Sequence, residues 1–234
     1  MLLDIEGTTT PIDFVYKVLF PYARAHLKDY LAADPLLGEI AGLVQDNIDD
    51  ARRGLDPPLI KGFTASLDLD SVEAYLLWLM DQDRKTTSLK SIQGKIWDEG
   101  YRRGELRSQV FDDVPPAFKR WCGEAMDICI YSSGSVLAQK LLFENTDAGD
   151  LTPFIRSYFD TNIGAKKESE SYRRIAKDLS LEPSAILFVS DVSDELDAGA
   201  SVGYETLLCV RPGNHPQNPA SNHRVVTTFD EIFP

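Results

Sequence analysis

The feature of this chain that most restricts its fold is a short buried strand at Leu2 and Leu3 that stands apart from every other predicted strand. Asp4 follows directly, at the point where such a strand would reach the open edge of a parallel sheet. The other strand patterns begin only after residue 107. The fold must therefore return the first residues to a sheet that the second half of the chain builds.

The second half of the chain alternates predicted strands with predicted helices, which favours a parallel sheet covered on both faces. Its β-branched, aromatic and apolar runs are typical of buried strands, and an irregular tail follows the last of them. The predicted strands lie within Asp127–Ser135, Ser157–Phe159, Ala185–Asp191 and residues 203–210. The predicted helices end near Gly123 or cover Val136–Glu144, Glu168–Leu179 and residues 194–201.

Residues 13–107 carry only helical patterns. Ile12–Ala33 is predicted to be helical with a bend at Pro21, and residues 35–53 repeat an amphipathic spacing. An Asp70 to Glu73 capping box opens an apolar helix, and Asp83–Tyr101 forms one more. The predicted fold class is α/β: a Rossmann-like, three-layer core from residues 1–12 and 108–234, with residues 13–107 as a helical cap over the sheet edge.

Composition argues against several classes of partner. Thirty-seven acidic and twenty-four basic side chains give a net charge of −13, which repels nucleic acid and anionic lipid. No apolar run exceeds seven residues, three scattered cysteines indicate reduced thiols, and no secretory leader precedes the first strand. We expect a cytoplasmic monomer that binds neither nucleic acid nor membranes. Because a phosphate ester would be repelled too, any phosphate site needs local cations.

The turn after the first strand gathers acidic and hydroxyl side chains. Asp4 and Glu6 are two positions apart, so in an extended segment both carboxylates would project to the same side. Gly7 permits a turn, and the hydroxyls and amides of residues 8–10 suit either a phosphate or a helix start. This pattern predicts a metal and phosphate site, although a strand end followed by a cap and a turn is the alternative.

Two further segments carry groups that suit phosphate chemistry. Ser132 and Ser133 follow a predicted strand, where they either donate to a phosphate or simply form a turn. Lys166 and Lys167 stand just before a predicted helix, an end at which the helix dipole disfavours cations. A functional role would explain that placement, and two solvated surface lysines are the alternative.

A cluster of acids follows the most apolar predicted strand. Asp191 ends that strand, and carboxylates at a buried strand end repel each other unless a cation lies among them. Magnesium prefers such oxygen ligands. We assign Asp191 to a metal site, whereas Asp194 is interpreted as a helix cap and Glu195 and Asp197 as residues of the first helical turn.

Taken together, these segments resemble the four motifs of the haloacid dehalogenase superfamily: Asp4 with Glu6, Ser132, Lys166 and Asp191. Glu6 stands where the superfamily usually has a second Asp, and DIEGTTTPI, residues 4–12, is similar to the enolase-phosphatase or acireductone synthase family. Three longer stretches are also similar to that family. They are DRKTTSLKSIQG (residues 83–94), YSSGSVLAQKLLF (131–143) and FDTNIGAKKESESYRRIA (159–176).

The resemblance implies a magnesium-dependent activity in methionine salvage. The family converts 2,3-diketo-5-methylthiopentyl-1-phosphate to acireductone, 1,2-dihydroxy-3-keto-5-methylthiopentene, by enolisation followed by phosphate release. By position, it implies one magnesium ion per subunit on Asp4, Glu6 and Asp191. Ser132, Ser133 and Lys166 would hold the substrate. Asp4 is the expected nucleophile, which would form an aspartyl phosphate, and Glu6 is the expected acid and base.

Three alternatives remain open from the sequence. A general magnesium-dependent phosphatase would use the same groups without enolisation, and a phospho-accepting signalling domain would also gather acids, a Ser or Thr and a Lys on a parallel sheet. The helical insertion and Glu6 argue against the signalling domain, which keeps its phosphate and needs no lid. A metal-free dehalogenase would have no use for Asp191.

Overall fold

The structure, a computed structural model, describes residues 1–33, 38–62, 67–216 and 222–233. The chain divides into two compact units: a sheet unit, Met1–Val18 with Leu106–Pro234, and a helical unit, Leu19–Glu105. The predicted cap, residues 13–107, begins a few residues before the helical unit and ends just after it. The α/β fold with an inserted helical segment is thereby confirmed, while the predicted boundaries at residues 12 and 108 stay a prediction.

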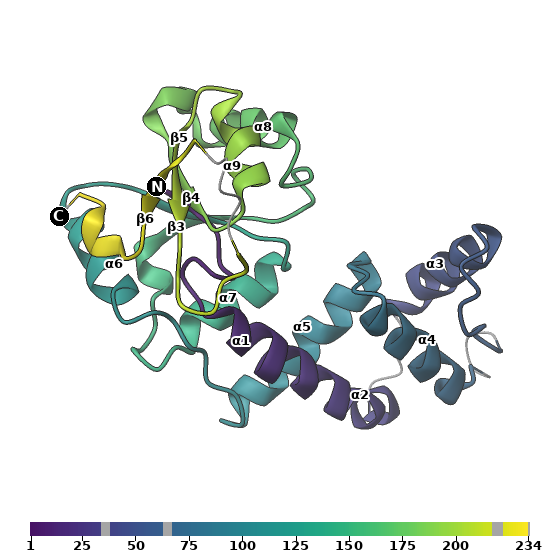
Figure 1. The fold of residues 1–234 in the computed structure, drawn as a ribbon. Coiled ribbons are helices and arrows are strands. Elements are labelled where there is room, and N and C mark those ends of the chain that lie inside the picture. The colour runs from purple at the N-terminus through teal and green to yellow at the C-terminus, as the bar shows by residue number, and fades with distance from the viewer. Residues whose placement is uncertain (34–37, 63–66, 217–221, 234) are drawn as a thin grey trace. The chain divides into compact units, whose positions relative to one another are not determined.

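A six-stranded parallel sheet forms the centre of the sheet unit, in the order β3-β2-β1-β4-β5-β6 (Figure 1). The two-residue strand β1 lies in the interior of this sheet, where Leu2 is opposite Cys129 on one side and Phe188 on the other. The first residues do return to a sheet built by the second half of the chain. The strands are β1 (Leu2–Leu3), β2 (Ile128–Tyr131), β3 (Ile155–Phe159), β4 (Leu187–Ser190), β5 (Glu205–Cys209) and β6 (Arg224–Val226).

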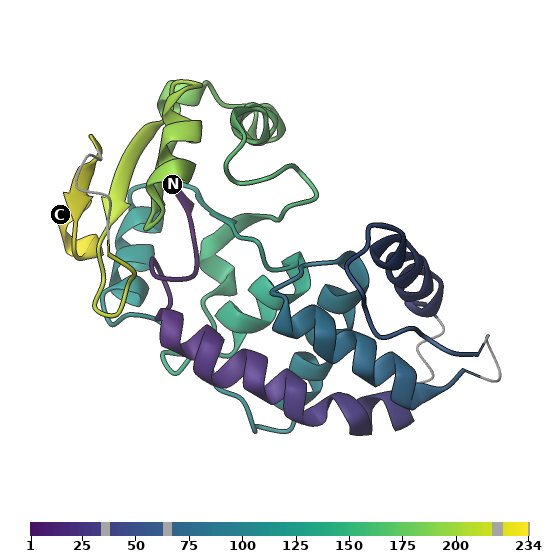
Figure 2. The same cartoon turned by 45° about the vertical axis from the view of Figure 1, so that its right-hand side comes forward.

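Helices cover both faces of the sheet (Figures 1 and 2). Successive strand residues face opposite sides, and Leu2 belongs to a buried cluster with Tyr172 and Leu196 from two of the covering helices. The other face packs against two helices. The helix Val114–Gly123, which carries Trp121, contacts β2, and the next helix, Val136–Glu144, contacts β3. The elements are α6 (Val114–Gly123), α7 (Val136–Glu144), η3 (Thr152–Phe154), α8 (Ser169–Leu179), η4 (Pro183–Ala185), α9 (Ser193–Ala200) and η5 (Phe229–Glu231).

The edge strand β6 was not predicted, because the sequence after β5 was expected to be irregular. Arg224 and Val225 are exposed, and only Val226 of this three-residue strand is buried. So short a strand with one buried residue lacks the apolar run or alternation on which a prediction depends. Pairing with β5 supplies the stabilisation that the local sequence does not.

The helical unit packs α2 against α4 and α5, and α3 against α5 (Figure 2). Its buried residues include Leu27, Tyr75, Leu79 and Ile92, in agreement with the predicted amphipathic spacing. The N-terminal part of the predicted helix over residues 35–53 falls partly on residues 34–37, which lie outside the described residues. The helices are α2 (Phe20–Ala33), α3 (Ile40–Arg52), α4 (Leu69–Asp81) and α5 (Thr87–Arg102).

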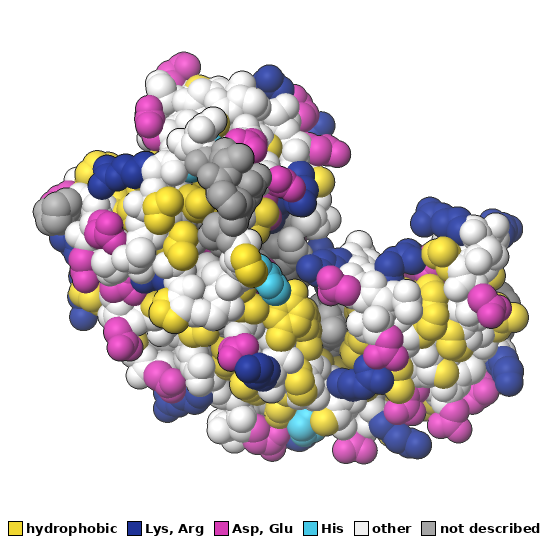
Figure 3. Space-filling model, in the orientation of Figure 1, with side chains coloured by type: hydrophobic (Ala, Val, Ile, Leu, Met, Phe, Trp, Pro, Cys, Tyr) yellow, Lys and Arg dark blue, Asp and Glu magenta, His cyan; other side chains and the backbone are white. Residues whose placement is uncertain are grey.

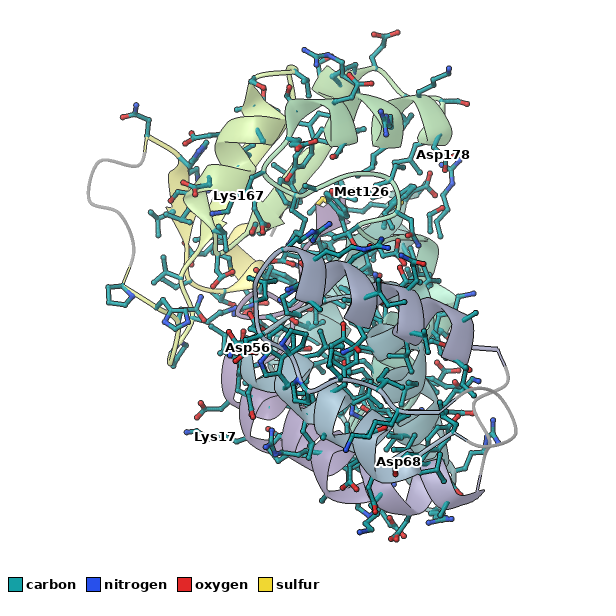
Figure 4. The ribbon with its side chains drawn as sticks, turned by 90° about the vertical axis from the view of Figure 1, so that its right-hand side faces the viewer. Lys17, Asp56, Asp68, Met126, Lys167 and Asp178 are labelled. Carbon is teal, nitrogen blue, oxygen red and sulfur yellow. The ribbon has the colours of Figure 1, made fainter. Side chains whose placement is uncertain are left out.

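One local prediction in the helical segment was wrong, and a second corresponds to an irregularity just before Pro21. The cap of α4 is Asp68, whose carboxylate accepts a hydrogen bond from Asp70 N–H at 3.2 Å, so the predicted Asp70 to Glu73 capping box does not open this helix (Figure 4). Before α2, the short helix α1 (Ile12–Phe14) continues into a π-helical segment η1 (Val15–Leu19), so the irregularity precedes Pro21. In a regular helix a proline ring would clash with the carbonyl group four residues earlier, and the π-helical segment includes that position, Lys17.

Candidate active site

Four parallel strands are each followed by a polar side chain, and three of these side chains are predicted site residues. Asp4 follows β1, Ser132 follows β2, Asp160 follows β3, and Asp191 follows β4. Because the carboxyl ends of parallel strands meet at one edge of the sheet, the register of these strands places these residues at the same edge. All four side chains are buried. The strands of the sheet therefore fix where these four residues begin their loops.

Lys166 links two carboxylates at this edge. Its Nζ lies 2.5 Å from Asp4 Oδ1 and 2.7 Å from Glu195 Oε2, and its side chain is 6 % exposed. Burial by itself lowers the pKa of Lys166, but the negative charges of Asp4 and Glu195 outweigh burial and hold that pKa above its ordinary value. The lysine is therefore a fixed cation beside Asp4. Tyr172 Oη donates to the Lys166 carbonyl at 2.6 Å and so fixes its backbone.

The neighbouring Lys167 has a different environment. Its ammonium pairs with Asp194 at 2.7 Å, and both side chains are more than 60 % exposed, beside α9 (Figure 4). A surface pair of this kind contributes about 0–1 kcal/mol to stability. Of the two lysines, only Lys166 is buried against Asp4. The structure also corrects the assignment of Asp194, because α9 has no side-chain cap and Asp194 lies within the helix.

Glu195 is a site residue that the sequence analysis missed by assigning it to an ordinary helical turn. It is 7 % exposed and accepts from Ser190 Oγ at 3.0 Å, in addition to its ion pair with Lys166. Burial, with the charge of Asp4 as the next cause, raises the pKa of Glu195 to about 7. The available signal was its position on the face of α9 that also carries the small buried residues Ala198 and Gly199.

The carboxylate of Asp191 lies against the backbone of the catalytic turn, which we define as residues 4–10. Gly7 has φ +74°, and a Cβ atom placed there would approach Asp191 Oδ2 to 2.5 Å. A side chain at this position would therefore meet both backbone strain and a steric clash. Burial, followed by the charge of Asp4, raises the pKa of Asp191 to about 7. Asp191 and Asp4 thus lie close enough to repel each other.

The catalytic turn is held together by its own backbone. The amides of Thr8, Thr9 and Thr10 all donate to the carbonyl of Ile5, at 2.9–3.1 Å. Of the two alternatives left open for these amides, a phosphate or a helix start, these hydrogen bonds fit a local turn, because the Ile5 carbonyl already accepts from all three. The chain also bends at Ile5 instead of staying extended. Any proximity of the Asp4 and Glu6 carboxylates consequently depends on this turn and not on strand alternation.

Ser132 and Ser133 lie between β2 and α7. Ser132 is 2 % exposed, and its Oγ accepts from Gly134 N–H at 3.2 Å, while Ser133 is partly exposed. Gln139 Nε2 donates to the carbonyls of Gly134 and Phe159, at 2.9 and 2.8 Å. This buried amide, which the sequence analysis did not single out, ties the serine loop to the end of β3.

The residues at this edge suit a magnesium ion. Within the described ranges, no group of three or more His, Cys, Asp or Glu side chains stands ready as a complete metal cage. Magnesium needs only one or two carboxylates and keeps several waters, and Asp4 and Asp191 supply two buried carboxylates. Burial, followed by the charge of Asp4, raises the pKa of Asp191, and a divalent cation between the two carboxylates would favour their charged forms. This donor set of hard oxygens fits magnesium better than a soft metal.

Several known proteins resemble this chain in sequence and in fold. A sequence model for haloacid dehalogenase-like hydrolases matches residues 1–203. The chain is 47% identical to enolase-phosphatase E1 of Synechococcus elongatus, over 99% of this chain and 96% of that protein. It is 42% identical to enolase-phosphatase E1 of Drosophila melanogaster, over 92% and 84%. The crystal structure of the UTR4 protein from Saccharomyces cerevisiae superposes with a TM-score of 0.78 at 34% identity, covering 99% and 98% of the two chains.

Proposed function

Because this chain belongs to the enolase-phosphatase E1 family of the haloacid dehalogenase-like hydrolases, we propose that it is the acireductone synthase of methionine salvage. Its substrate is 2,3-diketo-5-methylthiopentyl-1-phosphate, and its products are acireductone and phosphate. The observation that carries the assignment of the site is the buried contact of Lys166 Nζ with Asp4 Oδ1, at 2.5 Å. This contact gives a carboxylate nucleophile a permanent cationic neighbour where a phosphate must bind.

Asp4 is the proposed nucleophile. Its Oδ1 accepts from Lys166 and from Ile5 N–H at 2.8 Å, whereas among the described residues Oδ2 has a single, longer hydrogen-bond contact, with Ser190 Oγ at 3.3 Å. Oδ2 is therefore the less strongly held oxygen and the one we expect to attack phosphorus. The new bond joins this oxygen to phosphorus while the ester P–O bond breaks, which leaves an aspartyl phosphate. Hydrolysis of that intermediate by water releases phosphate and restores Asp4.

Glu6 is the proposed acid and base. It protonates the departing oxygen, and its carboxylate then removes a proton from the water that cleaves the aspartyl phosphate. Glu6 is also our candidate for the base that removes the C–H proton during enolisation. A side chain from residues 13–107 is the alternative for that step. Ser132, Ser133 and Lys166 hold the phosphate oxygens in this scheme, with Lys166 balancing their charge.

One magnesium ion per subunit completes the proposed site, held by Asp4, Glu6 and Asp191. In the superfamily, the residue at the position of Glu6 binds metal through its main-chain carbonyl, which leaves the Glu6 side chain for proton transfer. When bound, the ion neutralises charge on the phosphate and acidifies the C–H bond next to a substrate carbonyl. Asp191, with its raised pKa, gives up its proton to bind the ion.

The partners of the protein follow from the same arguments. No helix among the described residues is long and apolar enough to cross a bilayer. Acidic side chains are spread over the face drawn in Figure 3, in keeping with the net charge of −13, and this charge opposes nucleic-acid binding. We propose a cytoplasmic monomer that acts on a small phosphorylated diketone. Light scattering coupled to size-exclusion chromatography would measure the mass directly.

Product analysis tests the proposed reaction. The wild-type protein with magnesium and the diketone phosphate should release phosphate and form acireductone in equal amounts. Phosphorus NMR would measure the phosphate, and absorbance under anaerobic conditions would measure the acireductone. Asp4→Asn removes the nucleophile but keeps the side-chain size, so we expect a loss of at least about 10⁴-fold in turnover with an unchanged circular dichroism spectrum.

Two results would contradict the proposal. Release of phosphate with an unrearranged diketone would identify a general phosphatase without enolase activity. Appreciable residual turnover by Asp4→Asn would place the nucleophile elsewhere.

A further inference from the structure

The loop after β5 holds the catalytic turn from outside. Asn214 Nδ2 donates to the carbonyl of Gly7 at 2.9 Å and lies 3.4 Å from the carbonyl of Cys209. Arg211 Nε donates to the next carbonyl of the turn, that of Thr8, at 3.2 Å. Two consecutive carbonyls of the turn are therefore held by side chains that lie more than 200 residues away in the sequence.

The orientation of the Asn214 amide follows from its partners. Both neighbours of Nδ2 are carbonyl oxygens, which accept hydrogen bonds only, so the amide nitrogen must face them. The amide oxygen Oδ1 then faces the other side. It lies 2.9 Å from the position that a Cβ atom at Gly7 would occupy, and Asp191 Oδ2 lies 2.5 Å from that same position. An amide oxygen and a carboxylate oxygen thus converge over Gly7.

The amide oxygen Oδ1 of Asn214 has no hydrogen-bond partner within the ranges that the structure describes. The atom is buried, and no donor among the described residues reaches it. A buried acceptor left unpaired costs about 1–3 kcal/mol. Asp191 Oδ2 converges on the same point above Gly7, so a group held by Asp191 would lie within reach of this oxygen and would supply the donor that the described residues do not. A water molecule bound to a cation on Asp191 meets that requirement, since magnesium retains several of its waters.

We propose that Asn214 is a positioning residue of the magnesium site: Nδ2 fixes the catalytic turn through Gly7, and Oδ1 accepts a hydrogen bond from a water on the ion. This inference rests on the proposed function, because it requires magnesium at Asp191. It assigns a role to a residue from the loop after β5, which none of the four sequence motifs includes. Replacing partners of this kind typically weakens metal binding 10–100-fold.

Magnesium titration of the metal-free full-length protein tests the proposal. Asn214→Ala should raise the dissociation constant for Mg²⁺ by about tenfold or more, measured by isothermal titration calorimetry. Asn145→Ala is the matched control, because Asn145 Nδ2 also donates to a carbonyl, that of Leu141 at 2.9 Å, in a different loop of the same unit. The control should bind Mg²⁺ like the wild-type protein. If Asn214→Ala does not reach the native circular dichroism spectrum, Asn214→Ser replaces it.

A second readout concerns the bound water itself. In the protein loaded with Mn²⁺, ¹⁷O relaxation reports how long water stays on the ion, and Asn214→Ala should shorten that residence time. Unchanged Mg²⁺ affinity in the variant, or an unchanged residence time, would overturn the inference while leaving the proposed function standing. Absence of Mg²⁺ binding by the wild-type protein would instead overturn the proposed cofactor and this inference with it.

Discussion

At the scale of single residues, burial separates side chains that look equivalent in the sequence. Lys166 and Lys167 are adjacent, yet the first is buried between two carboxylates and the second pairs with Asp194 in solvent. An ammonium group is buried only when opposite charges compensate the loss of hydration. The ion pairs of Lys166 provide that compensation, so its position carries information that its residue type does not.

This difference predicts unequal effects of the same substitution. Lys166→Met should lower kcat about 10²–10³-fold, because the site loses a preorganised cation near the phosphate. Lys167→Met, the matched control, should change kcat less than about twofold, since it removes only a solvent-exposed pair. Steady-state kinetics with the diketone phosphate would measure both, and thermal unfolding would show whether each variant is folded. A larger loss for Lys167→Met would contradict the assignment.

At the scale of elements, a buried ion pair joins the start of α6 to the loop after β5. Asp113 Oδ2 accepts from Arg211 Nη1 at 2.7 Å, from Phe229 N–H at 2.5 Å and from Thr228 Oγ1 at 3.0 Å. Arg211 in turn holds the Thr8 carbonyl at 3.2 Å. The carboxylate thus serves these contacts instead of capping α6. Burial alone would raise the pKa of Asp113, but the Phe229 N–H and Arg211 outweigh it and lower that pKa.

Asp113→Asn should therefore destabilise the protein in a pH-dependent way. The substitution leaves the Arg211 guanidinium buried without its anion, so we expect a loss of about 3 kcal/mol in the free energy of unfolding at pH 7. A lowered pKa means that this contribution is present above the unfolded-state pKa of about 4 and is lost as the pH falls through the folded-state pKa.

Urea unfolding of both proteins at pH 7 and at a pH well below the unfolded-state pKa of about 4 would measure the loss. The difference between wild type and variant should shrink at the lower pH. A difference that stays constant with pH would show that the charge of Asp113 is not what stabilises this contact.

At the scale of the whole molecule, the acidic site links stability to pH and to magnesium. In the metal-free protein the pKa values of Asp191 and Glu195 are raised to about 7, whereas unfolded carboxyl groups titrate near about 4. The folded state therefore binds more protons between these values. The contribution of these two groups to stability is therefore fully present below about pH 4 and is lost as the pH rises through about 7.

Magnesium should reverse this loss. Without the ion, Tm should fall between pH 6 and pH 8. For each extra proton that the folded state holds relative to the unfolded state, we expect a fall of about 2–4 °C per pH unit. With saturating Mg²⁺, Tm at pH 8 should recover more than Tm at pH 6, because at pH 6 the ion must displace a proton from the site. Differential scanning calorimetry with and without Mg²⁺ would measure both effects. An equal increase in Tm at the two pH values would contradict the linkage.

The parts of this molecule that the sequence predicted depend on local patterns. The strands near Ile130 and Val189, and α8 with its strongly amphipathic spacing, follow from periodicity and were confirmed within a few residues. Strand β6 could not be predicted in this way, because two of its three residues are exposed and its pairing with β5 supplies the order. The cap of α4 lay two residues before the predicted one, since two acids in one short segment both match the preference.

By itself the sequence determined that acids, hydroxyls and a lysine follow the strands of a parallel sheet, because composition at strand ends is a local property. The family resemblance already singled out Lys166, and the tertiary structure shows how it differs from Lys167: Lys166 is buried against Asp4 and Glu195, whereas Lys167 pairs with Asp194 in solvent. Only the tertiary structure decided that Glu195, and not Asp194, is buried in this cluster. It also brought Asn214 to Gly7. Neighbouring charged residues have similar local preferences for helix and turn, and only the packing of distant segments determines which of their side chains is buried and loses its hydration.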